Sequence, residues 1–295
     1  GTYIFRNGVK ERLDTKTDHT ISALVYPFWH TSGDYVAFTV NITNEVVHTR
    51  NRNVVEVVDE ASDVVVYDVN NHEIITADIL SDNESFETFP TFSPDGRSLY
   101  FCSAKAVEPM PLKFRDVRYS LCRVDFNPED CSFGDKVDTL YNAVTQGGSV
   151  SFPRVSPDGR LVFTLSPYGN FSIWHKEADL YSIDLNDGTI ACMDALNSED
   201  VGSYHSWSGN SRWLVVSSRR DDGLYTRPYI AYVDENGMAH KPFLLPQKNP
   251  KDFYDSQMYA YNIPEFVNGK VQVTGSEIAS FARDTEGVKL GFRKK

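Results

Sequence analysis

The chain has 295 residues, of which 41% are apolar and 13% aromatic, and its formal net charge is −12 at pH 7. This apolar content is enough for a large core and excludes a chain that is disordered throughout. The acidic charge excludes non-specific binding to nucleic acid or to anionic lipid, because both need a cationic surface. No stretch reaches the roughly 20 apolar residues of a membrane-spanning helix, so we expect no membrane span.

A turn-centred pattern recurs along the chain at intervals of 52 to 63 residues. Each copy starts with an apolar residue, passes through a polar turn and continues into an apolar run. The copies begin at Tyr26, Phe89, Phe152, Tyr204 and, in weaker form, Ile263. Two of them contain Ser-Pro-Asp-Gly, at 93–96 and 156–159. Ser, Pro and Gly at the first, second and fourth positions favour a type I turn, so each copy predicts an antiparallel hairpin.

A second hairpin follows each of the first four copies. Its paired runs are 64–69 with 74–75, 119–126 with 137–141, 180–185 with 190–193, and 229–233 with 243–245. Asp187-Gly188 and Asn236-Gly237 supply the positive φ that tight hairpin turns require. Each unit therefore has four antiparallel strands, which we name a to d. Four-stranded units repeated at this spacing predict the blades of a β-propeller.

The two ends of the chain carry incomplete units. Residues 3–13 resemble a c–d hairpin, and the copy at Ile263 resembles an a–b hairpin. Together they would form one composite blade that closes the ring. We therefore predict an all-β fold, a β-propeller of four-stranded antiparallel blades, with five blades favoured and six as the alternative. Residues 1–275 are expected to form this single domain, and 276–295 a tail with a short helix and a strand.

The Ser-Pro-Asp-Gly hairpins, each preceded by an apolar-Pro-x-apolar strand, resemble the TolB-like, WD-repeat-like propeller family. The resemblance covers roughly residues 20 to 275, and segments 152–185 and 204–234 match best. It implies an exported or periplasmic bacterial protein that binds partners, with no catalytic residue to carry over. Propellers attached to prolyl-oligopeptidase-like hydrolases are similar as well. The first, fourth and fifth turns depart from the family pattern.

The connections between strands b and c are long, and strand alternation places them on one face of the disc. They span 44–62, 105–118, 168–178 and 219–227. Function concentrates in loops on a rigid scaffold, and Arg, Trp and Tyr are common interface anchors. We expect a protein-binding surface made by Arg115, Trp174, His175, Arg219, Arg220 and Tyr225. The alternative is that these side chains hold their own loops in place.

Two aligned positions in strand a define the walls of each blade. The first holds Phe28, Thr91, Arg154, Ser206 and Glu265. Its mixed character suits a water-lined central channel, where Arg154 and Glu265 would contact a ligand or pair with each other. The second holds Trp29, Phe92, Val155, Trp207 and Phe266, which we expect to be buried between blades.

No motif in the sequence identifies an enzyme. It has no GxSxG elbow, no HExxH and no P-loop. The four cysteines lack the CxxC spacing of a zinc site, and we expect free thiols, with a Cys122–Cys131 disulfide as the alternative. His175, Glu177 and Asp179 could face one side around a metal, but a loop without metal is the favoured interpretation. Glu87 and Glu265 are candidates for a glycosidase carboxylate pair.

The sequence therefore predicts a non-catalytic binding or scaffolding propeller for a protein partner, without cofactor or metal, in an exported bacterial context. Two alternatives stay open. One is a carbohydrate-active or sugar-binding propeller, and the other is a regulatory propeller domain of a larger hydrolase.

Overall fold

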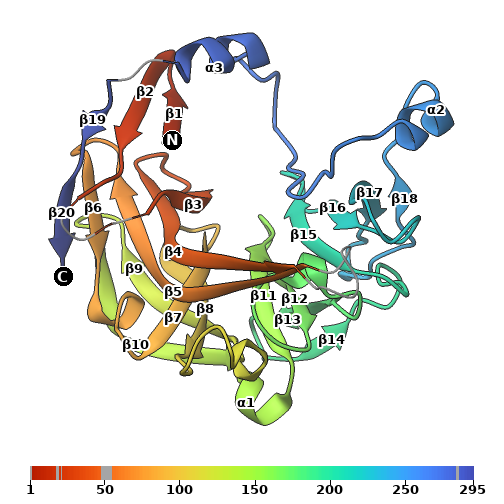
Figure 1. Cartoon of the computed structure of the whole chain (residues 1–295), viewed down its shortest axis with the longest axis horizontal. Coiled ribbons are helices and arrows are strands. Elements are labelled where there is room, and N and C mark those ends of the chain that lie inside the picture. The colour runs from red at the N-terminus through yellow and green to blue at the C-terminus, as the bar shows by residue number, and fades with distance from the viewer. Residues whose placement is uncertain (1, 18–19, 21, 48–54, 284–285) are drawn as a thin grey trace.

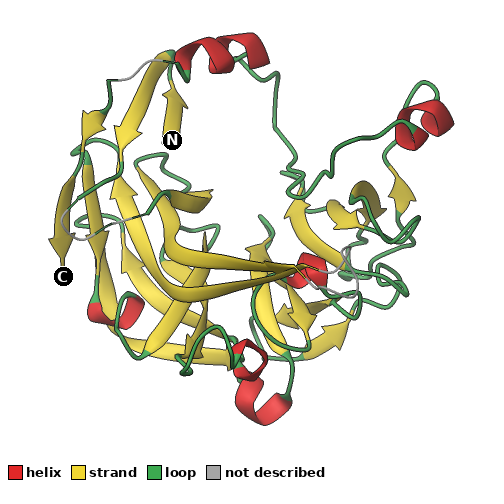
Figure 2. Cartoon of the chain, in the orientation of Figure 1, coloured by secondary structure: helices red, strands yellow, loops and turns green. Residues whose placement is uncertain are grey.

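A computed structural model describes residues 2–17, 20, 22–47, 55–283 and 286–295. Its strands form five sheets that follow one another around an arc (Figures 1 and 2). Four sheets are blades with four strands paired in chain order, the first of them extended by a C-terminal strand, and the fifth sheet joins both ends of the chain. The fold is therefore the predicted all-β propeller with four-stranded antiparallel blades.

The blades, numbered I to IV, correspond to the first four copies of the sequence pattern. Blade I has β3 (Leu24–Trp29), β4 (Tyr35–Val47), β5 (Val55–Asp68), β6 (Glu73–Thr76) and β20 (Gly291–Lys294). Blade II has β7 (Ser85–Phe92), β8 (Ser98–Lys105), β9 (Ser120–Asn127) and β10 (Ser132–Tyr141). Blade III has β11 (Ser149–Val155), β12 (Arg160–Ser166), β13 (Asp179–Asp184) and β14 (Ile190–Cys192). Blade IV has β15 (Gly202–Trp207), β16 (Trp213–Ser218), β17 (Arg227–Tyr232) and β18 (Phe243–Leu244).

The terminal sheet consists of β1 (Thr2–Arg6), β2 (Val9–Asp14) and β19 (Val288–Lys289). β1 and β2 form the hairpin expected at residues 3–13. The tail contains helix α3 (Gly275–Phe281), and its two strands run parallel to β2 and to β6. The remaining helices are α1 (Ala143–Gln146), α2 (Pro250–Asp255), η1 (Asp78–Leu80), η2 (Phe114–Asp116) and η3 (Ser172–Trp174).

The predicted a–b turns form in all four blades. Gly96 N donates to Ser93 O over 2.9 Å, and Gly159 N donates to Ser156 O over the same distance. Turns of neighbouring blades contact each other, since a ring nitrogen of His30 lies 2.9 Å from Gly96 O. These turns therefore gather on one face of the disc.

Four apolar clusters fill the spaces between consecutive sheets. They join the terminal sheet to blade I, blade I to II, II to III, and III to IV. In the described part of the chain, blade IV shares no such cluster with the terminal sheet. The closing composite blade also lacks its expected first hairpin, because 263–274 contains no strand. A hairpin without a neighbouring strand is marginal in water. Among the described residues, no strand is paired with segment 263–274. Closure of the ring by the terminal strands stays a prediction.

The second aligned position of strand a faces the preceding sheet, and its burial depends on that sheet. Phe92 is buried against blade I and Val155 against blade II, as predicted. Trp207 is only half-buried, although it packs on the cluster between blades III and IV. Trp29 is 41% exposed, because the three-stranded terminal sheet leaves it uncovered. Phe266 is half-buried beside blade IV. The prediction of full burial was therefore wrong for Trp29, Trp207 and Phe266.

The b–c connection of blade I differs from the predicted loop. β4 and β5 continue as paired strands from Val47 and Val55, so most of 44–62 is a long hairpin. Its β-branched residues favour extended pairing. The tip, residues 48–54, lies outside the described residues. This hairpin crosses the disc towards blade III (Figure 1).

Candidate functional site

Four aromatic side chains meet at the centre of the disc, one from the innermost strand of each blade. Ring centroids are 4.5 Å apart for Tyr26 and Phe89, 5.6 Å for Phe89 and Phe152, and 5.0 Å for Phe152 and Tyr204. Each of the four residues has φ between 44° and 53° and lies at a break in strand register. Such a left-handed residue is unfavourable outside glycine, and the bulge turns its ring to the axis. The aromatic cluster fills the centre that we expected to be water-lined.

Arg154, predicted to lie in the channel, is buried beside this cluster. Its guanidinium carbon lies 3.8 Å from the Phe152 ring centre and 5.2 Å from that of Phe28, and Nη1 donates to Pro153 O over 2.8 Å. Burial lowers the pKa of Arg154 to about 10, while Glu265 acts in the opposite direction. Glu265 is exposed and acts on Arg154 through its charge, without a direct ion pair between the two described residues. The predicted direct ion pair is therefore not formed; aromatic rings and a carbonyl hold the cation.

The long hairpin of blade I is fixed to blade III by a buried carboxylate. Asp59 accepts hydrogen bonds from Asn41 Nδ2 at 3.0 Å, Thr43 Oγ1 at 2.6 Å and Asn170 Nδ2 at 2.6 Å. Burial raises the pKa of Asp59 to about 6, although all three donors oppose the shift. The hairpin thus covers the centre of the disc on the b–c face.

Two of the predicted binding residues contact this hairpin. Arg115 lies 3.7 Å from Glu56 Oε1 and over the Tyr168 ring, at 5.7 Å from its centre. His175 packs edge-on against Tyr168 at 4.5 Å, and burial lowers the pKa of His175. Tyr168 OH donates to Glu56 Oε1 over 2.9 Å. Arg115 is exposed, while His175 is buried and holds the loop in place.

Trp174 and Arg219, also predicted as anchors, contact each other. The guanidinium carbon of Arg219 lies 5.6 Å from the Trp174 ring centre. Arg219 is buried, with Nε 3.8 Å from Asp200 Oδ1, and burial lowers its pKa. Trp174 is 37% exposed. The arginine is therefore engaged inside the protein, and only Trp174 presents surface.

The last two predicted residues have partners of their own. Arg220 Nη2 donates to Leu196 O over 2.7 Å, and its guanidinium stacks over Tyr229 at 4.6 Å. Tyr225 is half-buried in the turn capped by Asp222. Of the six predicted side chains, His175 and Arg219 are buried, while Arg115 and Trp174 present surface. Their role as a protein-binding surface stays a prediction.

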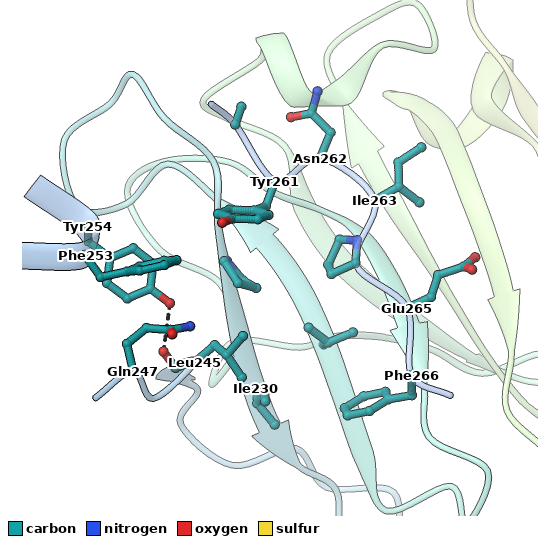
Figure 3. Close-up of a pocket in the computed structure, with 14 residues that line it drawn as sticks. Ile230, Leu245, Gln247, Phe253, Tyr254, Tyr261, Asn262, Ile263, Glu265 and Phe266 are labelled. Atoms are coloured by element: carbon teal, nitrogen blue, oxygen red, sulfur yellow. Dashed lines mark hydrogen bonds between the residues drawn. The ribbon is translucent and has the colours of Figure 1, made fainter. Parts of the chain in front are cut away.

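A pocket of about 510 Å³ opens beside blade IV, where the segment 260–266 passes along the sheet (Figure 3). Its walls come from strands β16 and β17, the chain after β18, helix α2 and that segment. The lining residues are Val215, Pro228, Ile230, Leu245, Gln247, Phe253, Tyr254, Ala260, Tyr261, Asn262, Ile263, Pro264, Glu265 and Phe266. This volume and this apolar character are typical of small-molecule sites.

Hydrogen bonds fix the segment that forms the outer wall of the pocket. Ser217 Oγ donates to the carbonyls of Tyr261 and Asn262 over 2.5 and 2.8 Å. Tyr261 N donates to Thr226 O over 3.0 Å. Along the segment, Phe266 points to the pocket while Glu265 points to the opposite side, towards blade III (Figure 3). The segment thus lies like an added inner strand without sheet pairing.

Aromatic rings and two amides, Gln247 and Asn262, are prominent in the lining of the pocket. Tyr254 is buried and donates from its hydroxyl to Leu245 O over 2.7 Å, with Gln247 beside it (Figure 3). Phe253 packs edge-on against Tyr254 at 5.0 Å. Tyr261 is 44% exposed at the entrance. Sequence analysis missed these residues, because 245–262 has no strand pattern; its only signal was the density of aromatic residues.

The structure does not bring the candidate metal and carboxylate residues together. In the described ranges, no three His, Cys, Asp or Glu side chains are close enough to share a metal ion. Glu87 is buried in blade II near Asp63 and Asp82, whereas Glu265 belongs to the segment beside blade IV. All four cysteines are free thiols. Among the described residues, no helix has the length and apolar character needed to cross a membrane.

Comparisons with known proteins give similarity in structure only. No family model matches the sequence, and no curated protein matches it. One similar solved structure is TolB from Acinetobacter baumannii, at 15% identity and a TM-score of 0.42, covering 77% of this chain and 55% of that one. The chain thus spans about half the length of that TolB.

Two further similar structures are enzymes. Oligogalacturonate lyase from Vibrio parahaemolyticus has 11% identity and a TM-score of 0.44, covering 81% of this chain and 70% of that one. Periplasmic gluconolactonase from Pseudomonas aeruginosa has 15% identity and a TM-score of 0.41, covering 84% and 78%. The similar structures are mostly enzymes, so the prediction of a non-catalytic scaffold that is not an enzyme is contradicted.

Proposed function

We propose that this propeller recognises a carbohydrate in the pocket beside blade IV. The observation that carries the proposal is the combination of aromatic walls with uncharged polar groups in one solvent-open hollow. Phe253, Tyr254, Tyr261 and Phe266 supply ring faces, and Gln247 supplies an amide. The C–H faces of a pyranose ring pack on aromatic rings, while its hydroxyls need hydrogen-bond donors and acceptors of this kind.

Charge within the pocket also favours a neutral sugar. Glu265 is the one charged residue of the lining, and its side chain extends away from Phe266 and the cavity (Figure 3). A glycosidase reaction uses two carboxylates across the bond that is cleaved. The lining offers one at most, so we propose recognition as the role of this pocket and leave the site of any turnover to experiment.

The test is isothermal titration calorimetry against a panel of neutral oligosaccharides. The variant Tyr261→Ala removes an aromatic wall that is 44% exposed, so the fold should tolerate it. We expect it to weaken binding roughly tenfold, which corresponds to about 1.4 kcal/mol. The matched control is Tyr259→Ala, because Tyr259 is 81% exposed and does not line the pocket.

Two results would overturn the proposal. One is that no oligosaccharide of the panel binds at millimolar concentration. The other is that Tyr261→Ala and Tyr259→Ala lower the affinity equally. Mass spectrometry of the same mixtures after incubation would show whether a bound sugar is converted. The exported setting stays a prediction, to be tested by fractionating cells that express the native gene.

A further inference from the structure

A second cavity, of about 460 Å³, lies between blades I and II, far in the fold from the pocket beside blade IV. It is bounded by the middle of β5, by the connection that leads into β7, and by the chain after β8. Its lining includes the carboxyl residues Glu60, Asp63, Asp82 and Glu108 and the apolar residues Phe86 and Met110. We refer to it as the acidic cavity.

The charged residues of this lining all have the same sign. Glu60, Asp63, Asp82 and Glu108 bring four carboxyl groups, and the lining includes no Lys, Arg or His. Lys294, a cation that acts on Asp63, has its ammonium 2.8 Å from Asp78 Oδ1 and lines the adjoining hollow instead. Its charge is therefore already paired outside the acidic cavity.

A buried carboxyl group behind the lining is incompletely satisfied. Glu87 is 2% exposed, and Ser103 Oγ donates to its Oε1 over 3.1 Å. Its other oxygen, Oε2, is buried without a hydrogen-bond donor in the described part of the chain. Among the groups that act on Glu87 are Ser85, Asp82 and Asp63, all of which line the cavity. An unsatisfied buried acceptor of this kind is costly unless a donor completes it.

Burial and the negative charges around the cavity also change the pKa values of the carboxyl groups there. Burial, with smaller contributions from the charges of Asp82 and Asp63, raises the pKa of Glu87 to about 7, while hydrogen bonds from Ser85 and Ser103 oppose the shift. Burial likewise raises the pKa of Asp63 to about 6, with Lys294 opposing and Asp82 adding to the shift. A positive charge in the cavity would relieve this repulsion. Ser62, also buried in the lining, places its hydroxyl beside that of the buried Tyr119.

The chemistry of the lining distinguishes between kinds of cation. A metal ion needs three or more ligands around one point, and the described residues hold no such group. Phe86, Val107, Pro109 and Met110 make part of the wall apolar. An ammonium group on a short carbon chain would satisfy both parts, with its N–H donors towards the carboxylates and its carbons against the apolar wall. We propose that the acidic cavity is a binding site for a primary alkylammonium group. This site does not depend on sugar binding beside blade IV.

The probe is butylammonium chloride, compared with 1-butanol, which has a similar size and no charge. Ligand-observed NMR titrations of the full chain at pH 7.5 give both affinities. We expect butylammonium to bind and 1-butanol to bind at least roughly tenfold more weakly, because only the former has a charge to pair. We expect Asp63→Asn to weaken butylammonium binding by roughly tenfold as well.

The matched control is Asp135→Asn, because Asp135 is exposed and does not line the cavity; its affinity should equal that of the wild type. If Asp63→Asn fails to fold, Glu108→Gln replaces it, since Glu108 is exposed at the rim. The proposal is overturned if 1-butanol binds as tightly as butylammonium. Equal affinities of the lining variant and the control would overturn it too, as would calcium chloride binding with displacement of the amine, which would identify a metal site.

Discussion

Asn170 and Asp59 are joined by a hydrogen bond of 2.6 Å from the amide Nδ2 to the carboxylate Oδ2, although 111 residues separate them in the chain. The bond connects a b–c loop of blade III to the long β4–β5 hairpin of blade I. It therefore crosses the centre of the disc instead of joining neighbouring blades.

Loss of the Asn170 side chain should destabilise the protein. A hydrogen bond to a charged acceptor contributes about 1.5–3 kcal/mol, and Asn170→Ala leaves Asp59 with one donor fewer in a buried site. We expect the free energy of unfolding in urea to fall by that amount at pH 7.5. Asn236→Ala is the control, since Asn236 is exposed in a turn. Equal stability of the two variants would show that the contact is not formed.

Asp59 should make the stability of the wild type fall as pH rises from about 4 to about 6. Its pKa is about 6 in the folded protein against an ordinary value of 3.8, so the folded state binds the proton more tightly. The contribution is present below the ordinary pKa and is lost as pH rises through the folded pKa. The free energy of unfolding of Asp59→Asn minus that of the wild type should therefore rise by about 2–3 kcal/mol between pH 4 and pH 7.

This difference isolates Asp59 from the other carboxyl groups. Asp63 and Glu87 also have raised pKa values, but they titrate in both proteins and cancel in the subtraction. A difference that stays flat or falls with pH would contradict the prediction.

At Phe152 the glycine variant should be more stable than the alanine variant, which is the reverse of the usual order, because the ring is buried and φ is +52°. Phe152→Ala removes the contacts with Phe89, Tyr204 and Arg154 and should destabilise by about 3–5 kcal/mol. Phe152→Gly removes the same contacts but accepts positive φ without strain. We expect it to be more stable than the alanine variant by up to about 1 kcal/mol.

The control for this order is Phe101, which is equally buried in β8 and has no positive φ. There the glycine variant should be less stable than the alanine variant by about 0.5–1 kcal/mol. The same order at both positions in thermal or urea unfolding would argue against a left-handed Phe152.

Trp174 and Arg219 should be energetically coupled. Their stacking predicts an interaction of about 0.5–1 kcal/mol or slightly more, since Arg219 is largely removed from water. A double-mutant cycle with Trp174→Ala and Arg219→Ala, read by urea unfolding, measures it. The comparison cycle pairs Trp174 with Arg115, which stacks on Phe114 and Tyr168 instead. Coupling equal to that of the comparison cycle would mean that the stacking contributes nothing.

The repeat pattern was sufficient to predict the architecture, because it is local. Ser-Pro-Asp-Gly sets a turn within four residues, and alternating apolar runs set strands on either side, so four blades could be assigned from the chain alone. The same repeat also predicted what Phe92 and Val155 pack against. The repeat pattern wrongly predicted full burial of Trp29 and Phe266. The burial of these two side chains depends on how far a neighbouring sheet extends, which the sequence of their own strand does not determine.

Tertiary structure alone decided the functional geometry. The pocket beside blade IV joins β16, β17, α2 and an unpaired segment, and the acidic cavity joins three connections of blades I and II. Neither set of residues is contiguous or periodic, so no local pattern marks them. The arginines of the b–c loops show the same limit. Their residue type suggested a binding surface. Instead, Arg219 and Arg220 contact aromatic rings, a carbonyl and a carboxylate within the protein. Long-range packing brings these partners to the two arginines, so the sequence around each arginine does not reveal them.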